Sequence, residues 1–161
     1  MAEKKGKARM DGDRLELDGF IPYRLSVMQQ EVSRAIAAAY ARKHDLMRHE
    51  WRVMAALGDD QPLSANEVCQ RTNMDKVQVS RAIARLKQKG LVNQHRDTQD
   101  RRRSSLRLTG RGEAIYRDIV PAARAREAEL LSALSANELK QLDKLIGKLY
   151  RRARDLNMGR E

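Results

Sequence analysis

Residues 97–112, which read DTQDRRRSSLRLTGRG, constrain the fold more than any other part of the chain. Leu106 and Leu108 alternate with Arg107, which is the pattern of a short strand with one buried face. The segment LVNQHRD just upstream supplies a second short strand, so we predict a β-hairpin with arginines 101–103 at its turn. Three adjacent guanidinium groups repel one another unless a polyanion neutralises them. The hairpin therefore predicts contact with DNA phosphate or with the negative minor groove.

The net charge of +11 is concentrated around this hairpin. From residue 76 to residue 111 there are eleven Lys and Arg residues against two Asp residues, a local balance of +9. Such focusing indicates a nucleic-acid-binding face. A membrane-surface protein would need a basic amphipathic helix with a free apolar face, and no apolar run reaches the roughly 18 residues of a membrane span. We therefore expect double-stranded DNA as the partner, no membrane, and a cytoplasmic location, which the single cysteine also favours.

Apolar periodicity predicts helices before and after the basic segment. Residues 1–18 are interpreted as a disordered tail. A first helix begins near Pro22 and carries one apolar stripe to Tyr40, and a second runs from about Met47 to Leu57 and ends at Gly58. The members of the stripe are Ile21, Leu25, Met28, Val32, Ile36 and Tyr40.

Capping signals divide the middle of the chain. Ser64 with Glu67 forms a capping box for a short helix, and Asp75 caps a helix that runs to about Lys89, where Gly90 closes it. A short helix, a turn, an amphipathic helix and a hairpin, in this order, make a winged helix-turn-helix. The predicted fold class is therefore mainly α with a small β-hairpin wing.

Two long helices follow the hairpin. Thr109 caps one over roughly residues 110–134, which contains Pro121, and Ser135 with Glu138 opens the last. The apolar stripes of the terminal helices exceed what one chain can cover, so we expect a homodimer. The predicted organisation is a tail over 1–18, a helical dimerisation region over 19–45 and 110–156, and a winged helix-turn-helix lobe over 46–109.

The helix after Asp75 has the composition of a recognition helix. Such a helix enters the major groove and reads base edges with its N-terminal residues, where Gln can pair with adenine and Arg with guanine. We expect Lys76, Gln78, Ser80 and Arg81 in this role, and Arg85 and Lys89 further along as phosphate contacts. An ordinary solvated helix face would look similar, but the arginine hairpin immediately downstream favours DNA. A dimer would then require a pseudo-palindromic operator with half-sites ~10 bp apart.

The segment MDKVQVSRAIARLKQKGLVNQHRDTQDRRRSSLRLTGRG resembles the DNA-binding core of the MarR family of bacterial transcriptional regulators. Its specific elements are D-x-x-D-R-R over residues 97–102 and L-T-x-x-G over 108–112, and the resemblance covers about residues 20–155. It implies a homodimer, a two-fold-symmetric operator and a small-molecule effector. By the same resemblance Arg102 matches the wing-tip arginine of the minor groove, and Asp100 the acid that orients it. Arg101 and Arg103 are interpreted as phosphate contacts, and a simple turn-forming role is the alternative for Asp100.

The effector pocket implied by the resemblance lies between the dimer helices and the DNA-binding lobe. Its expected lining residues are Arg24, Met28, His44, Trp51 and Tyr116. The segments IPYRLSV and EWRVMAALG resemble the corresponding segments of MarR-family members that respond to aromatic acids or their coenzyme A thioesters. The alternatives are a surface or dimer ion pair for Arg24 and a core position for Trp51.

Other functions find less support in the sequence. Cys69 lies on the apolar side of a short helix, which disfavours redox sensing. His44, Asp45, His49 and Glu50 are interpreted as a surface cluster, because histidines five residues apart do not share a helical face. We expect no cofactor, metal or enzymatic activity. The predicted function is a repressor released by an aromatic acid or acyl-CoA, and the alternative is an architectural DNA-binding protein without an effector.

Overall fold

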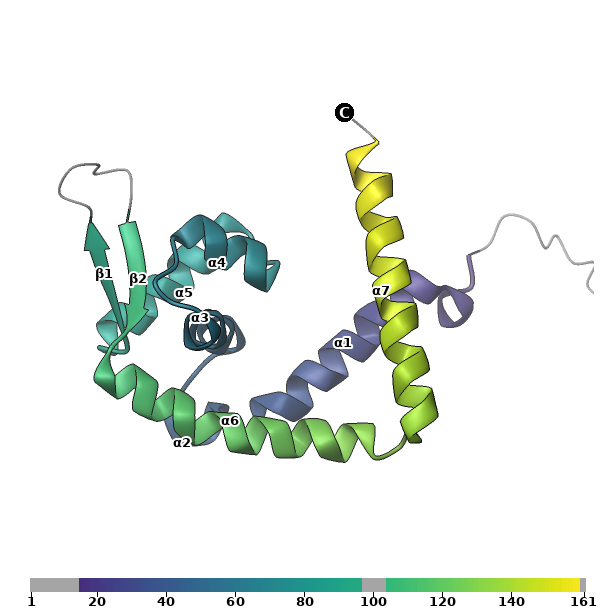
Figure 1. Ribbon diagram of the computed structural model, residues 1–161, viewed down its shortest axis with the longest axis horizontal. Helices are drawn as coiled ribbons and strands as arrows, with labels where there is room; N and C mark the ends of the chain where they lie inside the picture. The colour runs from purple at the N-terminus through teal and green to yellow at the C-terminus, as the bar shows by residue number, and fades with distance from the viewer. Residues whose placement is uncertain (1–14, 97–103, 160–161) are drawn as a thin grey trace, which may run out of the picture. The chain divides into compact units, whose positions relative to one another are not determined.

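The computed structural model describes residues 15–96 and 104–159, apart from the side chain of Arg96. The chain forms two compact units, residues 1–35 and residues 36–161, which are described separately below. Figure 1 shows the helices and strands in chain order. Within the described residues, no helix combines the length and the apolar character needed to cross a membrane.

The first unit contains a single 3-10 turn, Leu17–Gly19, and most of helix α1, Ile21–Ala37. The predicted start near Pro22 is confirmed, but the expected continuation to Tyr40 is wrong. Tyr40 has non-helical backbone angles and immediately precedes a separate short helix, α2, Ala41–His44. Its ring leaves the stripe because it packs on Trp51, with the ring centroids 5.6 Å apart and the tyrosine only 2% exposed.

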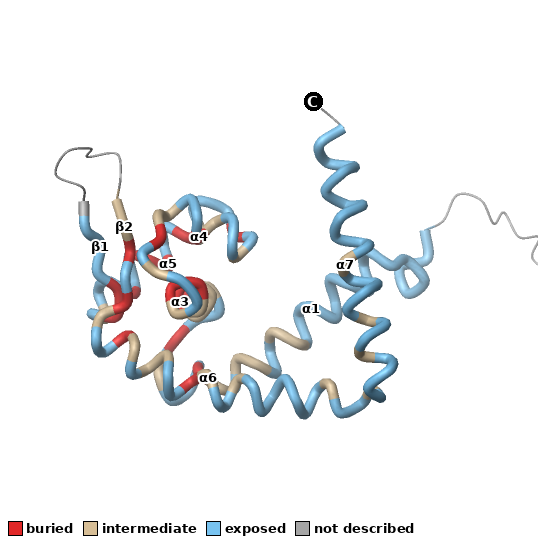
Figure 2. Tube along the Cα trace, viewed as in Figure 1, coloured by how far each residue is buried: buried red, intermediate tan, exposed pale blue. Residues whose placement is uncertain are grey.

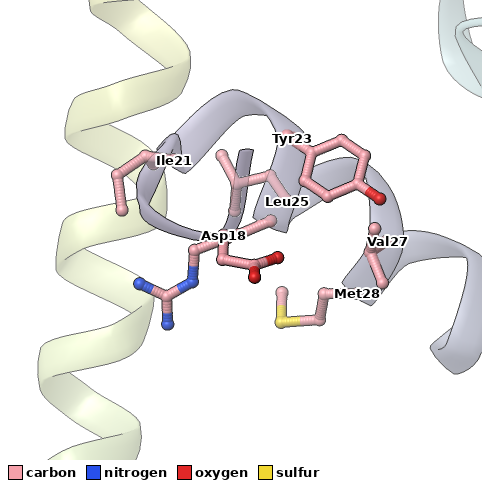
Figure 3. Close-up of a pocket in the computed structure, with 7 residues that line it drawn as sticks. Asp18, Ile21, Tyr23, Leu25, Val27 and Met28 are labelled. Carbon is pink, nitrogen blue, oxygen red and sulfur yellow. The ribbon is translucent and has the colours of Figure 1, made fainter. Parts of the chain in front are cut away.

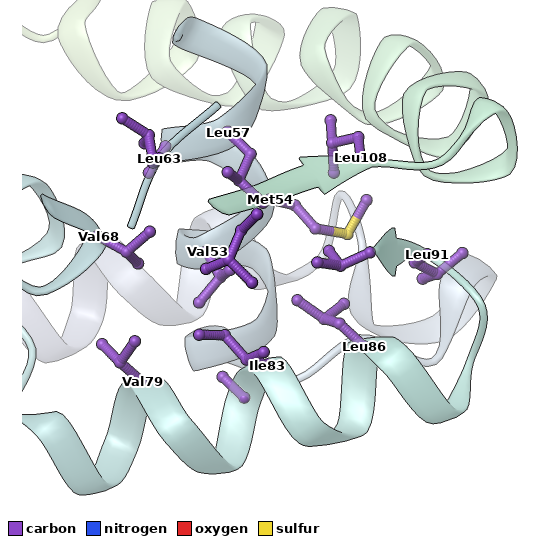
Figure 4. Packing of buried hydrophobic residues seen from close by; sticks show 14 of the residues in the cluster. Val53, Met54, Leu57, Leu63, Val68, Val79, Ile83, Leu86, Leu91 and Leu108 are labelled. Carbon is purple, nitrogen blue, oxygen red and sulfur yellow. The ribbon is translucent and has the colours of Figure 1, made fainter. Parts of the chain in front are cut away.

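The second unit has its apolar core in three helices and a hairpin. These are α3, Arg48–Asp59; α4, Ala65–Thr72; α5, Lys76–Gln88; β1, Val92–Arg96; and β2, Ser104–Leu108. Their inward faces are aliphatic, as Figure 4 shows, and Val53, Met54, Leu57, Val68 and Leu86 are wholly shielded from solvent. Burial of this size is the main favourable contribution to folding of the lobe.

The predicted caps of the central helices are confirmed. Ser64 and Glu67 form a reciprocal box at the start of α4, and Asp75 accepts a hydrogen bond of 2.7 Å from the backbone N of Gln78. Asn73 and Gly90 both adopt left-handed backbone, with φ of 51° and 66°. These two residues set the turn between α4 and α5 and the turn from α5 into the hairpin.

The hairpin is antiparallel, and its register runs from Val92 opposite Leu108 to Arg96 opposite Ser104. Leu106 and Leu108 are buried whereas Arg107 is exposed, which confirms the predicted alternation. Leu63, from the loop before α4, forms a β-bridge with Leu106 through backbone hydrogen bonds of 3.2 and 2.8 Å. The base of the hairpin is therefore attached to the helical core.

Helix α6, Gly110–Leu131, begins at the Thr109 cap and contains Pro121, as predicted, but it ends three residues before the expected Leu134. The backbone tightens there into a turn in which the Leu134 N–H donates to the Leu131 carbonyl. Helix α7, Ala136–Met158, opens with the predicted box of Ser135 and Glu138. Figure 2 shows that α7 is exposed along most of its length. Its exposed apolar side chains include Leu145, Ile146, Leu149, Tyr150 and Leu156.

The predicted end of the second helix at Gly58 is also wrong. Helix α3 continues through Gly58 to Asp59, and the glycine serves packing rather than termination. A Cβ atom at Gly58 would lie 2.3 Å from Cζ of Tyr116, inside the space of the ring. A larger residue at position 58 would therefore displace the Tyr116 ring of α6, which packs against the α3 backbone there.

Candidate nucleic-acid interface

The N-terminal half of α5 presents the predicted reading residues. Lys76, Ser80, Arg81 and Arg85 are exposed, and Gln78 is half-buried. The opposite face of the helix is held in the core by three buried aliphatic residues, Val79, Ile83 and Leu86. Packing of one face therefore fixes which side chains the helix shows to solvent.

The start of α5 is electropositive. Its first turn contains no acidic residue, and the free backbone N–H groups of a helix N-terminus carry a partial positive charge. Lys76 adds a full charge at this end and Arg81 adds another in the second turn, and within the described ranges neither forms an ion pair. Arg71 on α4, by contrast, is held by Asp59 at 3.2 Å and by Asp60. The cations of α5 thus stay available to an external anion.

The C-terminal end of α5 differs from the sequence prediction. Lys89, expected to contact phosphate, instead turns into the protein, where its Nζ lies 3.1 Å from Oε2 of Glu50 and 3.4 Å from Oδ2 of Asp45. Glu50, interpreted from the sequence as part of a surface cluster, is only 1% exposed. A buried carboxylate requires a cation and hydrogen-bond donors, and Lys89 is the cation within reach. Arg85 stays exposed, with its guanidinium against the Met47 sulfur.

His49, another member of that predicted cluster, is half-buried beside two arginines. Burial, followed by the charges of Arg48 and Arg52, lowers the pKa of His49. No group of three or more potential metal-ligating side chains occurs within the residues that the structure covers.

The base of the wing is fixed by a side chain from the loop that follows α3. Oε1 of Gln61 accepts a 2.8 Å hydrogen bond from the backbone N of Leu108, and its Nε2 donates to Glu113 at 3.3 Å. The Arg107 side chain is exposed on the hairpin. The predicted wing-tip residues Asp100, Arg101, Arg102 and Arg103 lie outside the described residues.

Three of the predicted effector residues lie in the second unit. The Trp51 ring stacks on Tyr116 with centroids 6.0 Å apart, between that ring and Tyr40. His44 lies 2.7 Å from Oδ2 of Asp118, one helical half-turn beyond Tyr116, and the hydrogen bonds from Lys43 and then His44 lower the pKa of Asp118. The structure therefore brings Trp51 and Tyr116 into contact and ties His44 to the same helix.

The other two predicted effector residues, Arg24 and Met28, lie in the first unit. They line one groove of about 540 Å³ on α1, shown in Figure 3. The walls are largely apolar, with one carboxylate and one guanidinium. The remaining lining residues are Asp18, Ile21, Tyr23, Leu25 and Val27.

Sequence reasoning missed several residues of the site. Val77 is 57% exposed on the reading side of α5, although an apolar residue there invited assignment to the core. Its spacing of three and four residues from Ser80 and Arg81 was the available signal. Gln61 was also missed, and no local pattern marks it, because it acts through contacts distant in sequence. Tyr40 was identified only as a member of the apolar stripe, and its contact with Trp51 was not predicted.

Comparison with known proteins agrees with this architecture. A family model described as MarR family matches residues 44–103. The HTH-type transcriptional regulator MgrA of Staphylococcus aureus is 27% identical over 121 residues, which cover 75% of this chain and 81% of MgrA. A probable transcriptional regulator from Pseudomonas aeruginosa, known from its crystal structure, is 27% identical with a TM-score of 0.73, covering 83% of this chain and 99% of that one.

A second solved structure links the fold to a ligand. This is the structure of BpsR from Bordetella bronchiseptica, whose DNA binding is regulated by 6-hydroxynicotinic acid. BpsR is 25% identical to this chain in sequence, and the two structures superpose with a TM-score of 0.74. The match covers 81% of this chain and 98% of BpsR. In its capped recognition helix and anchored hairpin, as in these matches, the chain is similar to DNA-binding transcriptional regulators of the MarR family.

Proposed function

We propose that the protein is a homodimeric repressor that binds a pseudo-palindromic operator and is released by a small aromatic carboxylate or its coenzyme A thioester. One observation carries the DNA-binding part: the exposed cations Lys76 and Arg81 lie unpaired, among the described residues, and Lys76 is at the positive end of α5. A cation at a helix N-terminus is unfavourable by itself, because it opposes the helix dipole. A bound polyanion converts that unfavourable arrangement into an attractive one.

The proposed roles follow the position of each side chain along α5. Gln78 and Arg81 face base edges, where an amide suits adenine and a guanidinium suits guanine. Lys76 and Ser80 belong to the same base-reading group, and Arg85 contacts phosphate. The proposal places Arg102 in the minor groove, oriented by Asp100, with Arg101 and Arg103 on phosphates.

The homodimer is supported by the apolar side chains of the terminal helices. Phe20, Ile21, Leu25 and Met28 in the first unit, and six large apolar residues of α7, are between 40% and 64% exposed. Apolar exposure on this scale is unusual for a monomer and typical of an interface. Two copies would place two recognition helices on one face of DNA, which explains the two-fold operator in the proposal.

The effector is supported by one neighbour and one groove. BpsR responds to 6-hydroxynicotinic acid, an aromatic acid. The groove of the first unit offers apolar walls and the guanidinium of Arg24, which suit an aromatic ring and a carboxylate. Met28 would adapt to the ring. His44, Trp51 and Tyr116 of the second unit are proposed separately as effector-binding residues.

Selection of bound sequences from random DNA, followed by fluorescence anisotropy, tests the DNA-binding role. We expect a two-fold-symmetric site bound about 10³-fold or more tightly than random DNA. Arg81→Ala should lower that ratio, whereas Gln78→Ala should relax preference at one base pair per half-site. Arg126→Ala removes the same charge from the exposed surface of α6 and serves as the control. A flat preference among sequences would instead support the architectural alternative.

The effector role is tested on the selected site with a panel of aromatic acids and their coenzyme A thioesters. We expect at least one compound to weaken operator binding, because release requires different affinities of the ligand for the free and the DNA-bound states. Arg24→Ala should abolish the response while leaving DNA affinity in the absence of ligand unchanged. A panel without effect on binding would remove this class of effector from the proposal.

A further inference from the structure

We propose that Val77 recognises the C5-methyl group of a thymine in each operator half-site and is thus a specificity-determining residue. The inference rests on the DNA-binding role proposed above. It assigns to an apolar side chain a function that the polar residues of α5 cannot perform.

The position of Val77 is the first part of the argument. It is the second residue of α5, one residue after Lys76, in the part of a recognition helix that meets base edges. Ser80 and Arg81 lie three and four residues further on, which places all three side chains on one face of the helix. Val77 is therefore surrounded by the residues proposed to contact DNA.

The exposure of Val77 is the second part. Among the described residues from 46 to 108, only Met47 and Val77 are large apolar side chains with most of their surface in solvent. Met47 has a partner within the protein, because its sulfur contacts the Arg85 guanidinium. Val77, at 57% exposure, is outside the core, and a β-branched residue is a poorer helix former than alanine. Folding of α5 therefore does not account for valine at this position.

The chemistry of valine is the third part. In the major groove, thymine presents one apolar feature, its C5-methyl group, which cytosine lacks. The valine side chain has no hydrogen-bonding atom and is restricted at its one rotatable bond, so fixing it against a methyl group costs little entropy. The contact would remove apolar surface of both partners from water while the neighbouring Arg81 retains its polar contact.

Replacement of thymine by deoxyuridine tests this directly, because the two bases differ only in the methyl group. The selected site is synthesised with each thymine of a half-site, and its symmetry mate, replaced in turn. We expect one symmetric pair whose replacement weakens binding of the unsubstituted protein roughly 10- to 20-fold, or about 3- to 5-fold per methyl group. With Val77→Ala, the same replacement should change affinity less than 2-fold, a loss of sensitivity that defines the contact.

A control variant and the selection experiment distinguish failure of the Val77 contact from failure of the proposed DNA-binding function. Gln88→Ala, which changes an exposed residue at the far end of the same helix, should retain the full response to deoxyuridine. A preferred site with no sensitive thymine, or an equal response in Val77→Ala, would overturn the Val77 contact while leaving the regulator intact. Failure to select any preferred site would instead count against the proposed DNA-binding function.

Discussion

The buried pair of Glu50 and Lys89 offers a quantitative test of how the recognition helix is held. The Glu50 side chain is 2% exposed, and its Oε2 accepts from Lys89 at 3.1 Å and from the Met47 backbone N at 2.8 Å. Its Oε1 has no hydrogen-bond partner in the described part of the chain. The pair joins the start of α3 to the residue that follows α5.

Lys89→Met would leave the carboxylate buried with one donor. Breaking a buried pair by removing one partner costs about 3–5 kcal/mol. The Lys89 side chain is 28% exposed, so water partly replaces the lost ammonium, and we reduce the expected loss to about 2–3 kcal/mol. Glu50→Gln with Lys89→Met removes both charges, and we expect that double variant to lose only about 1 kcal/mol. The two single changes would then be coupled by about 1–2 kcal/mol or more.

Urea unfolding at one fixed protein concentration measures these differences, because the stability of a dimer depends on concentration. Lys87→Met is the matched control, since Lys87 is exposed on α5 and its ammonium donates only to Gln94 among the described residues. We expect the control to change stability by less than about 0.5 kcal/mol. Additive effects of Glu50→Gln and Lys89→Met, or a Lys89→Met loss as small as the control, would refute the coupling of the pair.

Two further predictions concern packing and capping. Gly58→Ala places a Cβ 2.3 Å from the Tyr116 ring, so we expect the free energy of unfolding in urea to fall by roughly 1–3 kcal/mol. The fluorescence of Trp51 should also change, because Trp51 stacks on that ring. An unchanged spectrum and stability would contradict the contact. The hydrogen bonds from Ser135 lower the pKa of Glu138, so the stability this box contributes is present above the unfolded-state pKa and lost as pH falls through the lower folded-state pKa. Ser135→Ala should therefore destabilise the protein most near neutral pH, and the difference should shrink in acid to the part contributed by the bond from the Glu138 backbone N to the Ser135 hydroxyl, as followed by thermal melts across pH. An equal difference at every pH would exclude the carboxylate from the box.

Elements marked by local chemistry were predictable from the sequence. Asp75 begins α5 and Gly90 follows it because a cap and a left-handed turn depend on only a few neighbouring residues. The buried face of β2 followed from the alternation of Leu106, Arg107 and Leu108. Local signals of this kind do not depend on how the rest of the chain packs.

Features that arise from contacts distant in sequence could not be predicted. Gly58 was interpreted as a helix end, but the structural reason for glycine there is contact with the Tyr116 ring, fifty-eight residues later in the chain. Lys89 matched the periodicity of the solvent-exposed face of α5, yet it forms an ion pair with the buried carboxylate of Glu50 on α3.

The bridge between Leu63 and Leu106 also bears on how the protein behaves at high concentration. A two-stranded hairpin normally presents free backbone groups on both outer edges, where the strand of another molecule can add. Here the outward N–H and carbonyl of Leu106 are engaged by Leu63, and the N–H of Leu108 is engaged by Gln61. The outer side of β2 is thereby closed to strand addition at Leu106 and Leu108, so pairing with the strand of another molecule would have to use the outer side of β1.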